Sequence, residues 1–295
     1  MSMFEKIAQN IPDQQINFHD ITLTIRRLDL VHPQISGNKF FKLKYNFLEA
    51  KRQDYQHILS FGGAYSNHIA ATAFAAQQFG FQSVGMIRGE ELADHPLNPT
   101  LATAQQFGMQ LHFVSRDEYR RKQQPEYLAE LAQQFPEHYI IPEGGTNALA
   151  IQGCQEILKD GDAQFDVICC AVGTGGTISG LIEASHGHQQ VLGFSALKGS
   201  FLKDEIAQLT NKTNWNILDD YCCGGYAKTS AALMQFIRDF EAEFAIPLEQ
   251  IYTAKMLMGI FDLIEKNYFP AGSKLLVIHT GGLQGRHIPF GFTAT

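Results

Sequence analysis

Residues 165–180 of the chain are Phe165-Asp166-Val167-Ile168-Cys169-Cys170-Ala171-Val172-Gly173-Thr174-Gly175-Gly176-Thr177-Ile178-Ser179-Gly180. The apolar run predicts a buried strand, and the glycines after it predict a tight turn into a helix. Free backbone N–H groups and the positive end of the helix dipole meet at such a turn, which therefore favours an anion such as phosphate. The turn has neither the Gly-Lys-Ser/Thr of a P-loop nor the glycine spacing of a dinucleotide site. Taken alone, it leaves a connection without any ligand open.

Short apolar runs alternate with amphipathic helical stretches along most of the chain. This alternation predicts an α/β fold, with a parallel sheet covered by helices on both faces. Helices are expected from Asn67 to Phe79, ended by Gly80, and from Asn98-Pro99 to near Gly108. The segment 116–136 is rich in Gln, Glu, Arg and Tyr and predicts a solvated outer helix without a chemical role. The expected strands are 57–61, 83–87, 111–114, 139–141, 167–172, 191–195 and 275–279.

Length and composition exclude several classes of protein. The 295 residues are 45% hydrophobic, enough for a large core and for two closely joined domains. The net charge of -7 is not accompanied by a basic block, which argues against a nucleic acid partner. The sequence has no signal-like start and no long apolar run, so a cytoplasmic protein without a membrane partner is expected. Four of the five cysteines form the pairs Cys169-Cys170 and Cys222-Cys223, a pattern that predicts neither disulfides nor a metal site.

Three further glycine turns follow predicted strands, at Gly62-Gly63, Gly144-Gly145 and Gly281-Gly282. In a doubly wound sheet, the loops at the carboxyl ends of parallel strands converge on one crevice. We therefore expect all four glycine turns to line a single site.

Lys39 lies in Ser36-Gly37-Asn38-Lys39-Phe40-Phe41, after a Gly-Asn turn and at the start of a helix. The two phenylalanines offer apolar cover, and a lysine that is partly desolvated near other cations has a lowered pKa and a reactive amine. Taken alone, the motif favours an ordinary exposed lysine in a turn. Further along, Ser66 and Asn67 begin a helix, a place that suits a carboxylate or a ring hydroxyl, although capping alone also explains Ser66.

Together these segments resemble the 1-aminocyclopropane-1-carboxylate deaminase / D-cysteine desulfhydrase family of fold-type II pyridoxal-phosphate enzymes, which is related to the tryptophan synthase β subunit. The resemblance runs from Leu28 to Arg286, nearly the whole chain. Its most specific feature is spacing. In that family Ser-Asn begins 27 positions after the lysine of Gly-Asn-Lys, as Ser66 does after Lys39. Two tyrosines of the family stand 26 positions apart, as Tyr226 and Tyr252 do.

The resemblance implies a set of site residues around pyridoxal 5′-phosphate. Lys39 would carry the cofactor as a Schiff base and later move the Cα proton of the substrate. Tyr226 and Tyr252 match the two active-site tyrosines, one of which would act as a general acid. His68 is a further candidate for substrate contact, although a histidine at a helix start more often binds backbone. The phosphate would be bound by Lys42, Gly173, Thr174, Gly175, Gly176 and Thr177, the ring oxygen by Asn67 and the substrate carboxylate by Ser66.

Thr253 and Thr280 distinguish the two branches of the family. The cyclopropane ring-openers carry glutamate directly after the second tyrosine and leucine in a His-Leu-Gly-Gly turn, whereas this chain has the two threonines, as in the desulfhydrase branch. A carboxylate near the pyridine nitrogen deepens the electron sink, while a threonine hydroxyl offers only a hydrogen bond. Thiolate leaves more readily than a carbanion, so elimination from cysteine needs less help. Both threonines are therefore expected at the cofactor.

The expected reaction is β-elimination and deamination of a small D-amino acid, with D-cysteine giving pyruvate, ammonia and hydrogen sulfide. Deamination of 1-aminocyclopropane-1-carboxylate, or elimination from another β-substituted amino acid, stays open because the chain departs from typical relatives. Ala70-Ala71 replaces the usual Arg-Gln, and residues 193–199 and Cys222-Cys223 differ too. A phosphate- or nucleotide-binding module without catalysis is a remoter alternative, and the glycine spacing disfavours a dehydrogenase.

The resemblance also implies an architecture of two doubly wound open-sheet domains. Residues 1–45 and 150–295 would form the larger, cofactor-binding domain, and residues 46–149 a smaller inserted α/β domain. The cofactor would lie between them. A homodimer is implied as well, although no feature of the sequence indicates it directly.

Overall fold

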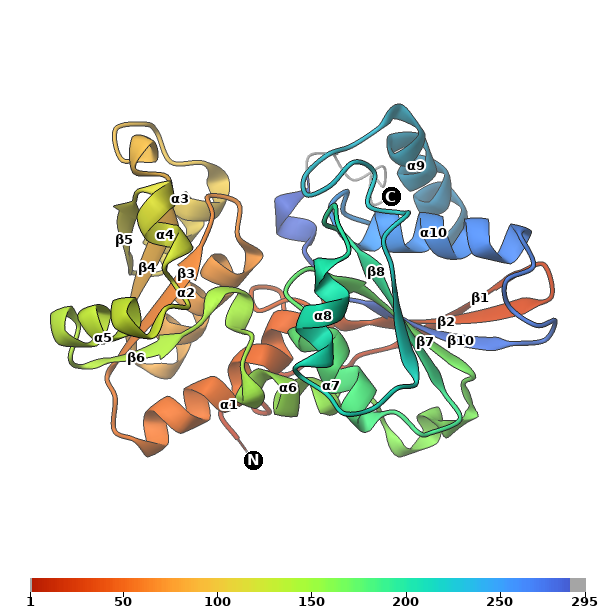
Figure 1. Cartoon of the computed structure of the whole chain (residues 1–295), viewed down its shortest axis with the longest axis horizontal. Helices are drawn as coiled ribbons and strands as arrows, with labels where there is room; N and C mark the ends of the chain where they lie inside the picture. The colour runs from red at the N-terminus through yellow and green to blue at the C-terminus, as the bar shows by residue number, and fades with distance from the viewer. Residues whose placement is uncertain (1, 287–295) are drawn as a thin grey trace.

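The computed structural model describes residues 2–286. Its strands form two sheets that lie on opposite sides of the molecule, each surrounded by helices (Figure 1). The expected α/β class with two parallel-sheet domains is confirmed. Residue 1 and residues 287–295, which belong to the expected larger domain, lie outside the described residues.

The larger sheet has six strands in the order β1-β2-β10-β7-β8-β9. The first two pair antiparallel, and all other neighbours in this sheet are parallel. Its central strands, β10 and β7, are buried along almost their whole length, as parallel strands covered on both faces are. The bounds are β1 Asp13–Phe18, β2 Ile21–Arg27, β7 Val167–Val172, β8 Gln190–Ser195, β9 Trp215–Leu218 and β10 Lys274–His279.

Helices cover both faces of the larger sheet, because alternate side chains of its strands are apolar in both directions. In β7, Ile168 and Cys170 pack into one core with Leu181 of α7, while Cys169 packs into the other with Leu257 of α10. Figure 1 shows α9 and α10 along one face and α6 and α7 along the other. The helices are α1 Asn38–Arg52, α6 Ala148–Gln155, α7 Gly176–Ala184, α8 Phe201–Ala207, α9 Ala231–Phe244 and α10 Thr253–Glu265.

The smaller sheet has four parallel strands in the order β5-β4-β3-β6. One face packs Leu59 against Tyr119 and Leu131, and the other packs Ile87 against Leu101. Its strands are β3 His57–Gly62, β4 Gln82–Arg88, β5 Met109–Val114 and β6 His138–Ile141. Its helices are α2 Asn67–Phe79, α3 Pro99–Gln106, α4 Arg116–Arg120 and α5 Pro125–Gln134. Short 3-10 helices complete the chain: η1 Leu28–Leu30, η2 Glu90–Leu92, η3 Glu143–Gly145, η4 Asp160–Gln164 and η5 Leu283–Gly285.

Local signals placed most of these elements correctly. Helix α2 is capped by the Ser66 hydroxyl and ends at Gly80 in the left-handed conformation. The Asn98 side chain caps α3 at the expected place. The prediction of one helix over 116–136 is wrong, because a turn separates α4 from α5, which begins at Pro125.

Among residues 2–286, no helix is both long and apolar enough to cross a membrane.

Candidate active site

A cavity of about 540 Å³ lies where the carboxyl ends of strands from both sheets meet. Gly63 follows β3, Gly144 follows β6, Gly173 follows β7 and Gly281 follows β10, and all four line this cavity. The expected convergence of the four glycine turns is therefore found.

The start of α1 is held against the turn that follows β10. Gly37 has a φ of +68°, and a Cβ at this position would lie 1.9 Å from the carbonyl oxygen of Thr280. The backbone N–H of Asn38 donates to the same oxygen at 3.2 Å. Only glycine permits both the left-handed conformation and this close approach. The contact places Lys39, the next residue, beside the Thr280 turn on the cavity wall.

Lys39 is half-buried, and its amine is oriented by a chain of polar contacts. Its Nζ donates to Asn38 Oδ1 at 3.0 Å, and the Asn38 amide donates to Thr177 Oγ1 at 2.8 Å. Burial lowers the pKa of Lys39 to about 8. A substantial fraction of this amine is therefore neutral near physiological pH and can react with a carbonyl.

Lys42 lies one helical turn further along α1 and points to the start of α7. Its Nζ donates to Thr146 Oγ1 at 2.8 Å and to Thr174 Oγ1 at 3.3 Å. A Cβ at Gly176 would lie 3.1 Å from this Nζ, so the glycine makes room for the lysine. Burial, and next the charge of Lys39, lower the pKa of Lys42 to about 7. A buried ammonium at a helix N-terminus forms a site that an anion would stabilise.

Ser66, Asn67 and His68 form the cavity wall contributed by the smaller domain. The Ser66 hydroxyl accepts from the backbone N–H of Ile69 at 3.3 Å. Within residues 2–286, the buried Oδ1 of Asn67 has no hydrogen-bond partner. The carboxamide therefore has hydrogen-bonding capacity left for a ligand.

His68 is 2% exposed and is held by Ser60. The Ser60 hydroxyl donates to the carbonyl oxygen of Ile141 at 2.9 Å and lies 2.7 Å from His68 Nε2. Because that hydroxyl has one proton, His68 Nε2 must donate to it, which leaves Nδ1 as the acceptor. Burial, and next the charges of Lys39 and Lys42, lower the pKa of His68 well below its usual value, so the ring is neutral.

Tyr226 and Tyr252 lie together on the side of the cavity formed by the larger domain. Their ring centroids are 6.2 Å apart in an edge-to-face arrangement. A Cβ at Gly173 would lie 3.1 Å from Tyr252 Cε1, so the tyrosine packs against the glycine turn 173–177 that was predicted to favour an anion. Burial raises the pKa of both phenols, and both therefore keep their protons at neutral pH.

Two of the expected cofactor contacts do not line the cavity. Gly176 lies behind its wall and supports Lys42, as described above. Thr253 is fully buried, and its Oγ1 lies 3.2 Å from Glu249 Oε1. Glu249 also accepts from the backbone N–H groups of Ile251 and Tyr252, each at 2.7 Å, and so closes the N-terminal end of α10. Thr280 does line the cavity, as do the remaining expected residues.

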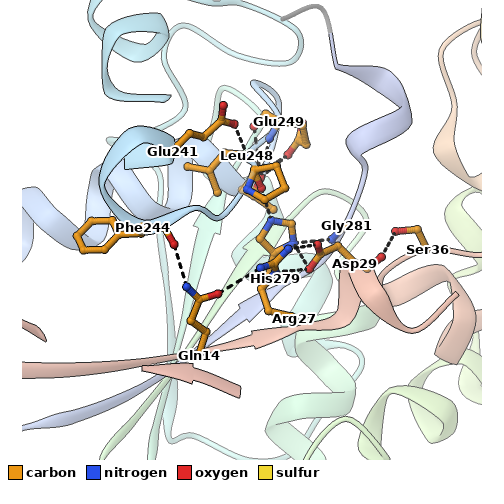
Figure 2. A network of polar contacts seen from close by, with 12 residues as sticks. Gln14, Arg27, Asp29, Ser36, Glu241, Phe244, Leu248, Glu249, His279 and Gly281 are labelled. Atoms are coloured by element: carbon orange, nitrogen blue, oxygen red, sulfur yellow. Dashed lines mark hydrogen bonds and ion pairs between the residues drawn. The ribbon is translucent and has the colours of Figure 1, made fainter. Parts of the chain in front are cut away.

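A buried polar network lies beneath the Lys39 and Thr280 turns, and Figure 2 shows its members. Asp29 pairs with Arg27 at 2.6 Å and lies 3.2 Å from Nδ1 of His279. The other ring nitrogen of His279 lies 2.8 Å from the carbonyl oxygen of Pro247. The backbone carbonyl of Asp29 accepts from the Ser36 hydroxyl at 3.1 Å. The network thus connects the segment that precedes Lys39 with His279, the last residue of β10 before the Thr280 turn.

Sequence reasoning did not identify the charged rim of the cavity, which consists of Arg88, Glu91, Arg116 and Glu143. Arg116 begins the segment to which no chemistry had been assigned. The sequence feature that could have identified this rim is a charged residue at the carboxyl end of a strand, such as Arg88 at the end of β4.

In the described part of the chain, no three His, Cys, Asp or Glu side chains are grouped to hold a metal ion.

Comparison with known proteins agrees with this geometry. The family model described as pyridoxal-phosphate dependent enzyme matches residues 23–281. The chain belongs to this family. It is therefore a pyridoxal-phosphate enzyme, and the alternative of a binding module without catalysis is wrong.

Its relatives include 1-aminocyclopropane-1-carboxylate deaminases and D-cysteine desulfhydrases. A Thermotoga maritima protein provisionally named as the deaminase is 30% identical, over 90% of each chain. A mitochondrial protein of Arabidopsis thaliana, named as a bifunctional D-cysteine desulfhydrase and deaminase, is 28% identical over 89% of this chain and 73% of its own. A crystal structure described as a deaminase homologue has 26% identity and a TM-score of 0.82, covering 95% of this chain and 91% of that one.

The residues present fit pyridoxal phosphate. The start of α7 with Lys42 suits its phosphate, and Oδ1 of Asn67, which has no partner among the described residues, suits a ring hydroxyl that donates a hydrogen bond. Lys39, whose pKa is lowered to about 8, suits its aldehyde. Each of these groups lies on the wall of one cavity.

Proposed function

We propose that this pyridoxal-phosphate enzyme catalyses β-elimination and deamination of a small D-amino acid, with D-cysteine giving pyruvate, ammonia and hydrogen sulfide. The observation that carries the proposal is the position of Lys39. Its amine has a pKa lowered to about 8 and shares a cavity with the glycine turn 173–177 and two protonated tyrosines. A base and a proton donor in one site are what an elimination needs.

Binding of the cofactor is assigned to three groups of residues. Lys42 and the turn 173–177 would hold the phosphate, Asn67 would hydrogen-bond the ring oxygen, and Lys39 would bind the aldehyde carbon through Nζ. When bound, pyridoxal phosphate supplies the electron sink that stabilises negative charge at the substrate Cα.

The chain's own residues then position the substrate and move its protons. Ser66 receives the substrate carboxylate at the start of α2, where free backbone N–H groups favour an anion. His68, neutral and fixed by Ser60, limits the space behind them. Lys39 Nζ would accept the Cα proton. Tyr226 or Tyr252 donates a proton to the leaving group.

Deamination of 1-aminocyclopropane-1-carboxylate is the second candidate, because relatives carry that name. Thr253 and Thr280 support the desulfhydrase reading, since neither places a carboxylate at the cavity wall. Glu249 has a raised pKa from burial and is engaged with the backbone of α10. Elimination from another β-substituted amino acid belongs to the same proposal.

Product analysis tests the proposal. We expect the purified holoenzyme to release equal amounts of pyruvate and sulfide from D-cysteine, with less than about 1% of that rate on L-cysteine, a difference of about 3 kcal/mol in transition-state binding. Ammonia and 2-oxobutanoate from the cyclopropane amino acid, without sulfide from D-cysteine, would identify the second candidate instead. No product from either substrate would exclude both named substrates and leave elimination from another β-substituted amino acid.

Three further assignments are part of the proposal and rest on the family resemblance. The smaller domain is taken as residues 46–149, within which all four strands of the smaller sheet fall. A homodimer is proposed, and light scattering of the holoenzyme measures its mass. A cytoplasmic location is proposed, and it suits the five free cysteines.

A further inference from the structure

Arg88 is the last residue of β4, and its side chain reaches the cavity from the smaller domain. Its guanidinium lies beside the glycine turn that leads to Ser66, since a Cβ at Gly63 would be 3.5 Å from Arg88 Nη2. The guanidinium also lies over the ring of Tyr119, with its central carbon 5.8 Å from the ring centroid. Arg88 is thus held at the cavity by a cation–π contact rather than by a carboxylate.

The carboxylates near Arg88 are engaged elsewhere. Glu91 pairs with Arg116 at 2.7 Å. Glu143 accepts from the Tyr119 hydroxyl at 2.6 Å and lies 3.3 Å from the Lys122 amine. Within residues 2–286, no carboxylate forms an ion pair with Arg88.

The remaining cations of the cavity wall already have a role. Lys39 and Lys42 serve the cofactor under the proposed function, and Arg116 is neutralised by Glu91. Arg88 is left on the cavity wall without an ion pair among residues 2–286, beside the glycine turn that leads to Ser66. A guanidinium presents planar, paired N–H donors, which match the oxygens of a carboxylate, sulfonate or phosphate.

We propose that Arg88 binds a second anionic group, carried on the β-carbon of the substrate, so that D-alanines with an oxyanionic β-substituent are substrates in addition to D-cysteine. This inference rests on the proposed β-elimination and names its substrate class. For 3-sulfo-D-alanine, the Cα–H and Cβ–S bonds break, and the Cβ–S electron pair leaves with sulfite. One water is consumed, and the products are pyruvate, ammonium and sulfite. No oxidant or reductant is required.

The decisive experiment compares leaving groups in the holoenzyme. Pyruvate release is measured with 3-sulfo-D-alanine, O-phospho-D-serine and the uncharged β-chloro-D-alanine. We expect Arg88→Gln to lower the ratio of kcat/KM for an oxyanionic substrate to that for the chlorinated one by roughly 30-fold, as loss of a charge-assisted contact would. Arg88→Lys should restore part of the ratio. Sulfite and phosphate assays show which oxyanion is preferred.

Arg121 provides a matched control in the same domain. It also lies over a tyrosine, with 4.9 Å to the ring centroid of Tyr127, but it pairs with Glu130 and does not line the cavity. We expect Arg121→Gln to leave the ratio unchanged. An equal loss on all three substrates in Arg88→Gln would overturn the inference, because Arg88 would then serve the α-carboxylate or the fold. Turnover of β-chloro-D-alanine alone by the wild type would also overturn it.

A binding measurement separates this inference from the proposed function. D-Aspartate and D-asparagine have nearly the same shape, differ in side-chain charge and carry no β-leaving group. Calorimetric titration of the holoenzyme should show D-aspartate binding roughly tenfold more tightly, and Arg88→Gln should remove the preference. Absence of any pyruvate from D-cysteine and from all three of these substrates would refute the proposed function, whereas equal binding of the two ligands would refute the role of Arg88.

Discussion

Lys39 and Lys42 lie three positions apart on α1. Folding disfavours protonation of both side-chain amines. Their pKa values are lowered from 10.5 to about 8 and about 7, mainly by burial. At a pH between the pKa of such a lysine in the folded protein and its pKa in the unfolded chain, the unfolded chain binds more protons than the folded one. The free energy of unfolding of the cofactor-free protein must therefore gain a rising contribution as pH increases through this window.

This linkage predicts a pH dependence that Lys42→Met reduces. Between pH 7.5 and 9.5, each such lysine adds up to about 1.4 kcal/mol of stability per pH unit. We expect the free energy of unfolding of the cofactor-free variant, from urea titrations, to rise less steeply with pH than that of the wild type. Parallel curves would show that Lys42 is solvated in the folded protein. Lys51→Met, an exposed position on the same helix, is the control.

The sequence predicted that Lys39, Lys42, Ser66 and Asn67 belong to one site, and all four line the cavity. Their roles remain predictions that rest on short motifs and the spacing between them. The sequence did not identify Arg88 or Glu249. The role of Arg88 depends on which carboxylates pair with other cations, and such pairings involve residues far apart in the chain. Thr253 was expected at the cofactor, but the carboxylate of Glu249, four positions earlier, holds its hydroxyl.

At the scale of elements, the contact between the start of α1 and the turn after β10 fixes where the reactive lysine lies. It depends on Gly37, whose missing side chain admits the carbonyl oxygen of Thr280. The Asp29 network lies under the same two segments, as Figure 2 shows. Displacing either segment would move Lys39 relative to the phosphate turn.

Gly37→Ala should therefore destabilise the protein much more than the same change at a glycine with free space. Gly37 and Gly272 both have positive φ, +68° and +80°, but nothing lies within 4 Å of a Cβ at Gly272. We expect Gly272→Ala to cost about 1–2 kcal/mol, the cost of the left-handed backbone. Gly37→Ala should cost roughly 3–5 kcal/mol because the backbone must also move. Urea denaturation measures both, and similar costs would contradict the close contact.

The elements that sequence placed well have strong local signals, such as the Ser66 cap and the Gly80 end of α2. The strands that it missed were β1, β2 and β9. In β1 the sequence is mostly polar because the strand lies at the sheet edge, and β9 has only four residues. Their pairing with β2 and β8 is a long-range property, which local hydrophobicity does not indicate.

At the scale of the molecule, the two sheets share one hydrophobic core as well as one cavity. Ile58 and Ile141 of the smaller sheet belong to the same core cluster as Ile168 and Ile278 of the larger one. Figure 1 shows α1 passing between the two halves. The cavity is therefore bounded by strand ends whose relative position is fixed by packing.

The two-domain architecture followed from the family resemblance and from strand–helix alternation. The crossing of the chain between the sheets could not be derived from composition, which has no linker rich in Gly, Pro or Ser. The grouping of the glycine turns within each sheet was predictable, because parallel strands place their carboxyl ends on one edge. That the edges of both sheets face one cavity depends on how the two sheets pack, which local sequence does not indicate.

The most direct test of the account is to locate the cofactor in the intact protein. The holoenzyme is reduced with borohydride, its mass is measured, and it is digested with trypsin, which does not cleave after a modified lysine. Attachment at Lys39 predicts one pyridoxyl phosphate per chain on the peptide 28–42. A label on the peptide 40–44, which would place it at Lys42, or no label after saturation with pyridoxal phosphate, would contradict the central claim.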